Sequence, residues 1–345
     1  MSPKTPNVNY FYRAYGLALV SDTPVPALRE ERLELARPGI VVSLGPEPAW
    51  VREVKHLPIR VDRPRDQIPE GDGSSFTLST IGEGEFFELA YGDETRFFVD
   101  GAANRIWGTW HPPLTIEDIS TYLLGPILGF VLRRRGVLAL HASCVCLSEG
   151  ALALCGSSAT GKSTTAAALA LRGLPVLTDD ITPVKEEQGS LYVEPGYPRA
   201  CLWPEAVEIL FGAPGALPRI TPTWEKRFLA LDGVKAKFAS KKRPLKAVYL
   251  LAPRADEANA PRIEGVGMRD ALVELLQNTY MNWLLDRDQR AIELDALTKL
   301  VTKVPVRRIV PHVDGARIVA LCDLILEDAE RASGQQFSAT DLALQ

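Results

Sequence analysis

Eight consecutive residues near the middle of the chain have the types and spacing of a phosphate-binding loop. They read Gly156-Ser157-Ser158-Ala159-Thr160-Gly161-Lys162-Ser163, match GxxxxGK[ST] at every fixed position, and are followed by Thr164. Glycines allow backbone N–H groups to face phosphates, and a helix beginning near Gly161 adds the positive end of its dipole. Lys162 would neutralise phosphate charge, and the Ser163 hydroxyl would bind Mg²⁺. We therefore predict that residues 156–164 bind a nucleoside triphosphate, with ATP and Mg²⁺ as cofactors. The alternative is a glycine turn that opens an ordinary helix.

Two adjacent carboxylates follow this loop. Asp179 and Asp180 stand 17 and 18 residues after Lys162, at the end of an apolar run. The expected order of strand, loop, helix and strand is a βαβ unit, which returns both carboxylates to the loop. One could hold magnesium while the other accepts the proton of an attacking hydroxyl. Because strand side chains alternate, the two should not share a role. Alternatively, the pair caps the turn that follows.

A histidine precedes the loop on an expected strand. His141 lies 21 residues before Lys162 in the alternating segment 137–147. Its imidazole could orient a phosphoryl oxygen or the catalytic carboxylate. The alternative is a core histidine with satisfied hydrogen bonds.

A downstream cation could assist phosphoryl transfer or bind the substrate. Arg199, on an expected hairpin over residues 191–203, is the preferred candidate. A further basic stretch could supply one or two such cations, although a solvated loop is expected for most of it: Lys226, Arg227, Lys235, Lys237, Lys241, Lys242, Arg243 and Lys246.

These residues require elements that position them. Residues 1–112 alternate in period two and carry turn dipeptides at Asp72-Gly73 and Asp100-Gly101, which predicts an N-terminal β-rich domain. Residues 113–345 predict an α/β domain. Its expected elements are helix 116–133, strands 137–147, 151–156, 175–180 and 246–252, and helices 162–172, 269–285, 288–302 and 314–332.

Composition narrows the class of protein. The 345 residues are 46% hydrophobic and 24% charged with a net charge of −4, which is typical of a soluble globular protein and gives no reason to expect nucleic acid as a partner. Five cysteines without paired CxxC motifs favour a reducing cytoplasm. No secretory signal is visible, and the most apolar run, residues 122–132, is too short for a bilayer, so no membrane association is expected.

The segment from His141-Ala142-Ser143 through the loop to Asp179-Asp180 resembles the catalytic core of HPr kinase/phosphorylase. These are P-loop protein-serine kinases related in fold to phosphoenolpyruvate carboxykinase. The resemblance implies that Asp180 accepts the substrate proton, that Asp179 supports magnesium and that His141 is an active-site residue. The chain lacks that family's Glu-Ile-Arg-Gly signature, so the resemblance does not extend to its second magnesium-supporting Glu or to the reverse phosphorylase reaction.

A second resemblance concerns the segments YRAYGLALVSD and LLGPILGFVLRRRGVLALHAS, which look similar to the HPr-kinase-like enzymes of lasso peptide biosynthesis. It implies a kinase that phosphorylates the C-terminal residue, typically serine, of a precursor peptide. Because the expected kinase core is complete without the N-terminal domain, we hypothesise that this domain recognises the peptide. Homo-oligomers occur in the wider family. The alternatives are a kinase of a free small molecule, such as an amino acid, and a nucleotide-binding regulatory ATPase.

Overall fold

The computed structural model describes residues 9–31, 39–63 and 76–333. The chain forms two compact units, Met1–Arg135 with Thr221–Thr223, and Gly136–Ile220 with Trp224–Gln345. The sequence placed the boundary after residue 112, whereas the compact units divide after Arg135. The difference is the helical segment 116–134, which packs within the first unit.

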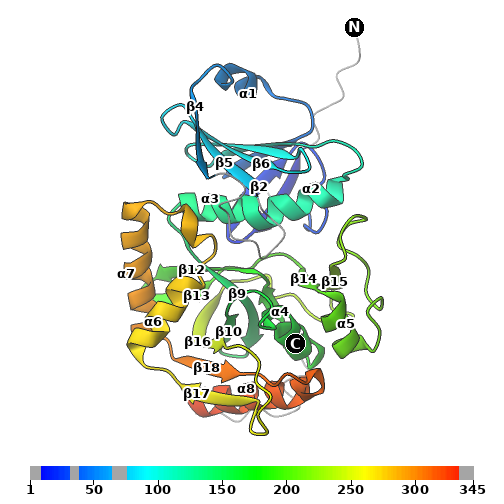
Figure 1. Ribbon diagram of the computed structural model, residues 1–345, viewed down its shortest axis with the longest axis vertical. Helices are drawn as coiled ribbons and strands as arrows, with labels where there is room; N and C mark the ends of the chain where they lie inside the picture. Colours follow the sequence, from blue (N-terminus) through cyan, green and yellow to red (C-terminus); the bar gives the residue numbers. More distant parts are fainter. Residues whose placement is uncertain (1–8, 32–38, 64–75, 334–345) are drawn as a thin grey trace. The chain divides into compact units, whose positions relative to one another are not determined.

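The described part of the first unit is built on an eight-stranded sheet in the order β1-β2-β3-β8-β7-β6-β5-β4 (Figure 1). Strands β2, β3 and β8 pair in parallel, and the remainder is an antiparallel meander. The expectation of a β-rich N-terminal region is therefore confirmed. Asp100 closes the turn between β7 and β8 by accepting from the backbone N–H groups of Asn104 and Arg105. The Asp72-Gly73 turn lies outside the described residues. The elements are β1 (Tyr10–Ala14), β2 (Leu17–Ser21), β3 (Ile40–Leu44), α1 (Ala49–Val54), β4 (Ile59–Arg63), β5 (Phe76–Ile81), β6 (Phe86–Tyr91), β7 (Arg96–Asp100) and β8 (Arg105–Thr109).

A helical segment packs on this sheet through aromatic side chains. It comprises α2 (Ile116–Tyr122), a π-helical turn (Leu123–Ile127) and α3 (Leu128–Arg134). The Tyr122 ring lies 4.3 Å from that of Tyr91, and the Phe130 ring lies 5.3 Å from that of Phe87. The π turn contains Pro126, whose missing N–H and bulky ring disfavour a regular α-helical ladder.

The second unit contains a mixed sheet in the order β10-β9-β12-β13-β16-β18-β17, with β11 beside β9 and an additional pairing of β10 with β16. Strands β10, β16 and β18 run in parallel. Their carboxyl ends therefore meet at one edge of the sheet. The strands are β9 (Leu138–Leu147), β10 (Gly150–Cys155), β11 (Val176–Thr178), β12 (Ile181–Glu187), β13 (Ser190–Val193), β16 (Arg243–Leu251), β17 (Arg262–Gly265) and β18 (Val306–Val310).

Helices cover both faces of this sheet (Figure 1). On one face, Val145 of β9 belongs to a buried cluster with α4 (Lys162–Leu171), α5 (Pro204–Phe211) and α8 (Ile318–Ser333). On the other face, Leu140 and Cys144 belong to a cluster with α6 (Met268–Gln277) and α7 (Arg287–Lys303). The alternation of β9 thus separates two cores, as its sequence predicts. The mixed α/β class is confirmed, although α6 ends at Gln277 and only a short 3₁₀ turn follows at Asn282–Leu284.

The hairpin expected over residues 191–203 is wrong. Strand β13 pairs with β12 and β16, whereas β14 (Arg199–Leu202) pairs with β15 (Arg227–Ala230). Two prolines lie between β13 and β14, Pro195 and Pro198, and proline has no N–H for a strand ladder. The chain consequently leaves the sheet after β13, and β14 carries Arg199 to a separate two-stranded pair.

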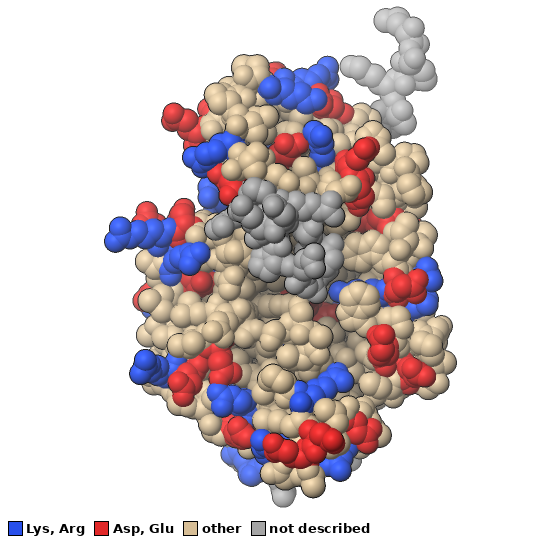
Figure 2. All heavy atoms as spheres, in the orientation of Figure 1, with Lys and Arg blue, Asp and Glu red and all other residues tan. Residues whose placement is uncertain are grey.

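Charge is mixed over the surface. Among the described residues on the face that Figure 2 shows, basic and acidic side chains are interspersed, consistent with the net charge of −4. All five cysteines are free thiols. A search of the described residues for helices that could cross a membrane found none.

Candidate phosphoryl-transfer site

The phosphate-binding loop connects the end of β10 to the start of α4, as predicted. Gly161 has φ +100°, a left-handed conformation that glycine adopts without strain, and α4 begins at the next residue. Within the loop, the Thr160 hydroxyl donates to the Ser157 carbonyl oxygen at 2.9 Å. The loop therefore places its backbone at the N-terminus of a ten-residue helix, where N–H groups lack intrahelical partners.

Lys162 is folded back over this loop. Its Nζ donates to the Ser157 carbonyl oxygen at 2.9 Å, and the residue is only 6% exposed. Burial lowers the pKa of Lys162, while the charges of Asp180 and Asp179 oppose that shift. An entering phosphate would offer this buried ammonium a stronger acceptor than a neutral carbonyl oxygen.

Asp180 lies beside His141 at the same edge of the sheet. In the strand registers, Ala142 of β9 faces Cys155, the last residue of β10, and His141 faces Ile181. The His141 Nε2 atom lies 3.2 Å from Asp180 Oδ1. The sequence-predicted histidine and carboxylate are thus brought together at the end of the strand that leads into the loop.

The Asp180 carboxylate is partly exposed to solvent and its pKa is lowered. Its side chain is 46% exposed, and its backbone has φ +68°. Burial of the surrounding site opposes ionisation, but the hydrogen bond and charge of His141, with the charges of Lys226 and Lys162, lower the pKa of Asp180 to about 2. Asp180 is therefore ionised at neutral pH and can accept a hydrogen bond from an incoming hydroxyl.

Asp179 has a different environment. The residue is 6% exposed, and each carboxylate oxygen accepts one hydrogen bond. The Ser143 hydroxyl donates to Oδ1 at 2.6 Å, and the Cys201 backbone N–H donates to Oδ2 at 2.8 Å. The two neighbouring carboxylates have separate partners, with Asp179 fixed in the interior and Asp180 open to solvent.

A close backbone approach holds this strand end in place. The Gly196 N–H donates to the Leu177 carbonyl oxygen at 2.9 Å. A Cβ added at Gly196 would lie 2.6 Å from Thr178 Oγ1. The loop between β13 and β14 therefore packs on β11 immediately before the Asp pair, and only glycine fits there.

The sequence favours Arg199 as the functional cation, whereas the structure draws attention to Lys226. The Arg199 guanidinium lies 4.2 Å from the centre of the Phe228 ring, and Lys226 Nζ lies 5.0 Å from that of Trp203. Lys226 lowers the pKa values of both Asp180 and Lys162, so its charge reaches the centre of the site. In the described part of the chain Lys226 forms no ion pair with a carboxylate. In the sequence Lys226 is one of eight basic residues in the same stretch, and no pattern distinguishes it from the others.

The donors available for magnesium are few. Among the described residues, no group of three His, Cys, Asp or Glu side chains could hold a metal by itself. Mg²⁺ usually keeps several waters and binds one or two carboxylates together with substrate phosphates. Ser163 and Asp179 are the donors that the sequence predicts, and both carboxylate oxygens of Asp179 already accept hydrogen bonds from the protein.

Comparisons with known proteins add little beyond a general likeness. None of the protein families against which the sequence was scanned matches it, and no curated protein does. The structure is similar to that of the Hpr(Ser) kinase/phosphatase from Coxiella burnetii, with 13% sequence identity over 57% of this chain and 93% of that chain, at a TM-score of 0.29. A TM-score this low assigns neither fold family nor activity.

Proposed function

We propose that this chain is an ATP- and Mg²⁺-dependent kinase with an HPr-kinase-like core that phosphorylates a serine hydroxyl of a peptide or protein. The observation that carries the proposal is the ionised, solvent-accessible Asp180 carboxylate, paired with His141 at the sheet edge that bears the phosphate loop. Nucleotide switches and pumps share such loops. An accessible carboxylate supported by a histidine suits a site that takes a proton from an attacking hydroxyl.

Each residue has a defined task in this reaction. The loop amides and Lys162 bind the phosphates, and Ser163 and Asp179 hold magnesium, which supplies charge neutralisation when bound. Asp180 orients the serine hydroxyl and accepts its proton as the Oγ–P bond forms and ADP leaves. His141 fixes the orientation of Asp180.

Lys226 is proposed to stabilise negative charge on the transferred phosphoryl group. Preorganised cations and donors at such positions contribute on the order of 10²-fold or more to turnover. Lys226→Met is therefore expected to lower kcat by about 10²-fold with a smaller effect on ATP affinity. Lys246→Met is the matched control, because Lys246 is an exposed lysine on β16. Equal kcat values for the two variants would remove Lys226 from the mechanism.

The finer identity of the acceptor rests on the sequence resemblance. The segments shared with lasso peptide kinases favour the C-terminal serine of a precursor peptide, and a cytoplasmic location follows from that role. Arg199 is a second candidate contact for phosphate or peptide, since its guanidinium already stacks on an aromatic ring.

The test is phosphate transfer measured by mass spectrometry. The purified protein is incubated with Mg²⁺ and γ-labelled ATP, together with a precursor-type peptide ending in serine, the same peptide ending in alanine, or free serine. A gain of one phosphate on the serine peptide alone supports the proposal. Phosphoserine formed from free serine alone would make the chain a small-molecule kinase, and free phosphate without a labelled acceptor would indicate a regulatory ATPase.

Matched aspartate variants connect the activity to the site. Asp180→Asn is expected to abolish transfer. Asp323→Asn, at a surface carboxylate paired with Arg172, is expected to leave it unchanged. If Asp180→Asn retained full transfer, the proposed proton acceptor would be wrong.

A further inference from the structure

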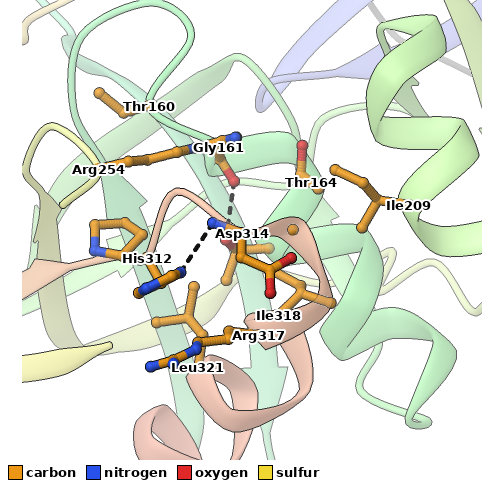
Figure 3. A pocket seen from close by; sticks show the side chains of 13 residues that line it. Thr160, Gly161, Thr164, Ile209, Arg254, His312, Asp314, Arg317, Ile318 and Leu321 are labelled. Carbon is orange, nitrogen blue, oxygen red and sulfur yellow. Dashed lines mark hydrogen bonds between the residues drawn. The ribbon is translucent and has the colours of Figure 1, made fainter. Parts of the chain in front are cut away.

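A pocket opens beside the phosphate loop, within the second unit. Its empty volume is about 390 Å³, a figure that includes the open solvent at its mouth. The loop residues Gly161 and Thr164 form one wall (Figure 3). The other walls come from α5 and from the segments that follow β16 and β18.

The strand order explains why the pocket forms there. Because β10, β16 and β18 are parallel, the phosphate loop, Arg254 and His312 all follow strand ends at the same edge of the sheet. Ligands of α/β sheets commonly bind outside the carboxyl ends of the strands. The pocket is therefore a product of the same edge that positions the phosphate loop.

The strand order also separates the pocket from the reacting groups. His141 and the Asp pair lie on the β9 and β11 side of β10, whereas the pocket lies on the β16 and β18 side. A phosphate that reacts near Asp180 must leave the rest of its nucleotide on the opposite flank of the loop. Gly161 and Thr164 face that flank.

One basic side chain of the pocket, that of Arg254, lies directly beside the phosphate loop. Arg254 is exposed and reaches the loop, since a Cβ added at Gly161 would lie 3.4 Å from its Nη2. Across the described residues Arg254 has no hydrogen bond or ion pair. A guanidinium beside the helix N-terminus is suited to a phosphate or a ribose oxygen.

His312 supplies a second donor. Its side chain is 9% exposed, and its Nδ1 accepts the Asp314 backbone N–H at 2.9 Å. Because Nδ1 is the acceptor, the ring proton is on Nε2. The nearest carboxylate oxygen to Nε2, on Asp256, is 3.9 Å away, which is too far for a hydrogen bond. The Nε2–H group of this pocket-lining histidine is thus not hydrogen-bonded to that carboxylate.

Part of the remaining wall is apolar, and the polar side chains of Asp314 and Arg317 lie beside it. Ile209, Ile318 and Leu321 line the pocket (Figure 3), and Ile209 is 39% exposed at its rim. Gly315 allows this wall to approach closely, because a Cβ there would lie 2.6 Å from Ile209 Cδ1. An apolar slot with a few convergent donors matches a heterocyclic base attached to a sugar.

We infer that this pocket binds the nucleoside portion of ATP, with Arg254 at the α-phosphate or ribose, His312 donating to the ribose or base, and Ile209 covering the base. The inference rests on the proposed nucleotide-binding function of the loop. It assigns nucleoside recognition to residues far from the phosphate motif in sequence.

Calorimetric titration with two probes tests it. ATP and inorganic tripolyphosphate, each with Mg²⁺, share the phosphates and differ in the nucleoside. The wild-type chain is expected to bind ATP at least about tenfold more tightly, an advantage equivalent to about 1.4 kcal/mol. Ile209→Trp, which fills the pocket from its rim, is expected to remove that advantage while tripolyphosphate affinity stays within about twofold.

Ile292→Trp is the matched control, since Ile292 is likewise an exposed isoleucine on a helix. Ile209→Ala keeps the test valid if tryptophan prevents folding, and should weaken ATP severalfold without affecting tripolyphosphate. Equal wild-type affinities for the two probes, or unchanged ATP affinity in both Ile209 variants, would overturn the inference.

A different result would contradict nucleotide binding by the phosphate loop, on which the proposed function depends. If Lys162→Ala left the affinities for both probes unchanged, the phosphate loop itself would not be the nucleotide site. Because no acceptor is used, a failure to find phosphate transfer does not affect this outcome.

Discussion

The Asp pair offers a test in which neighbouring residues should respond differently to substitution. Asp179→Ala removes the acceptor of two buried donors, the Ser143 hydroxyl and the Cys201 backbone N–H. Each unsatisfied donor costs about 1–3 kcal/mol, so the free energy of unfolding should fall by about 4 kcal/mol. For a domain of about 150–250 residues this corresponds to a decrease in Tm of about 8–16 °C.

Asp180→Asn should behave in the opposite way. Asp180 is 46% exposed and has φ +68°, a conformation that asparagine tolerates well. Loss of its pairing with His141 should lower the free energy of unfolding by about 1 kcal/mol or less, because the Asp180 side chain is nearly half exposed, while phosphate transfer is lost. The two neighbouring carboxylates are thereby expected to differ in how strongly their loss destabilises the fold.

Asp179→Asn is the control that keeps the size and hydrogen-bonding capacity of the Asp179 side chain. Its amide oxygen can still accept from the Cys201 N–H, and its NH₂ group can donate to the Ser143 hydroxyl oxygen, so most of the stability should remain while the negative charge is removed. Thermal and urea unfolding, followed by circular dichroism without nucleotide, measure all three variants. The reasoning is refuted if Asp179→Ala unfolds within about 1 kcal/mol of wild type, or if Asp180→Asn is as destabilising as Asp179→Ala.

Three further predictions concern the surroundings of the site. The Asp180 carboxyl has a pKa of about 2 in the folded chain against an ordinary 3.8, so its stabilising contribution is present above pH 3.8 and is lost as the pH falls through 2. Its ¹³Cγ resonance, assigned with the Asp180→Asn variant, should therefore not titrate between pH 8 and about 4. A titration midpoint above 3.8 would contradict the pairing of Asp180 with His141. Gly196→Ala should lower the free energy of unfolding in urea by about 1–3 kcal/mol, because the added Cβ collides with Thr178. Gly215→Ala is the control and should be nearly neutral, because no atom lies within 4 Å of a Cβ added there. Equal effects of the two substitutions would show that the collision at Gly196 is relieved. Burial raises the thiol pKa values, so intact mass after iodoacetamide treatment at pH 8 should show little alkylation of the native chain. Rapid labelling at more than the partly exposed Cys201 would contradict the burial of Cys144, Cys146, Cys155 and Cys322.

Local pattern was enough for the elements around the phosphate loop. The fixed residues of the loop, the apolar run before it and the Ala-rich helix after it all indicate the same strand-loop-helix unit, and β10 and α4 are found there. The alternation of residues 137–147 likewise predicted a strand with two distinct faces, and the two faces of β9 lie in different cores. These features depend on periodicity over a few residues, which the sequence displays directly.

Pairing between distant strands could not be obtained in this way. The hairpin expected over residues 191–203 failed because β14 finds its partner in β15, beyond an intervening helix and loop. Nothing in the local sequence distinguishes that partner from the adjacent β13. The same pairing explains why Arg199 could be predicted as a cation while its stacking on Phe228 could not.

The sequence by itself determined the phosphate loop and the chemical types of its helpers, because spacing along one βαβ unit fixes which strand ends meet. Only the tertiary structure decided their separate environments. It buried Asp179 between Ser143 and Cys201, left Asp180 open beside His141, brought the charge of Lys226 to the site, and formed a pocket from Arg254 and His312. These differences depend on solvent exposure and on contacts between residues far apart in the chain, and neither property is contained in a local sequence pattern.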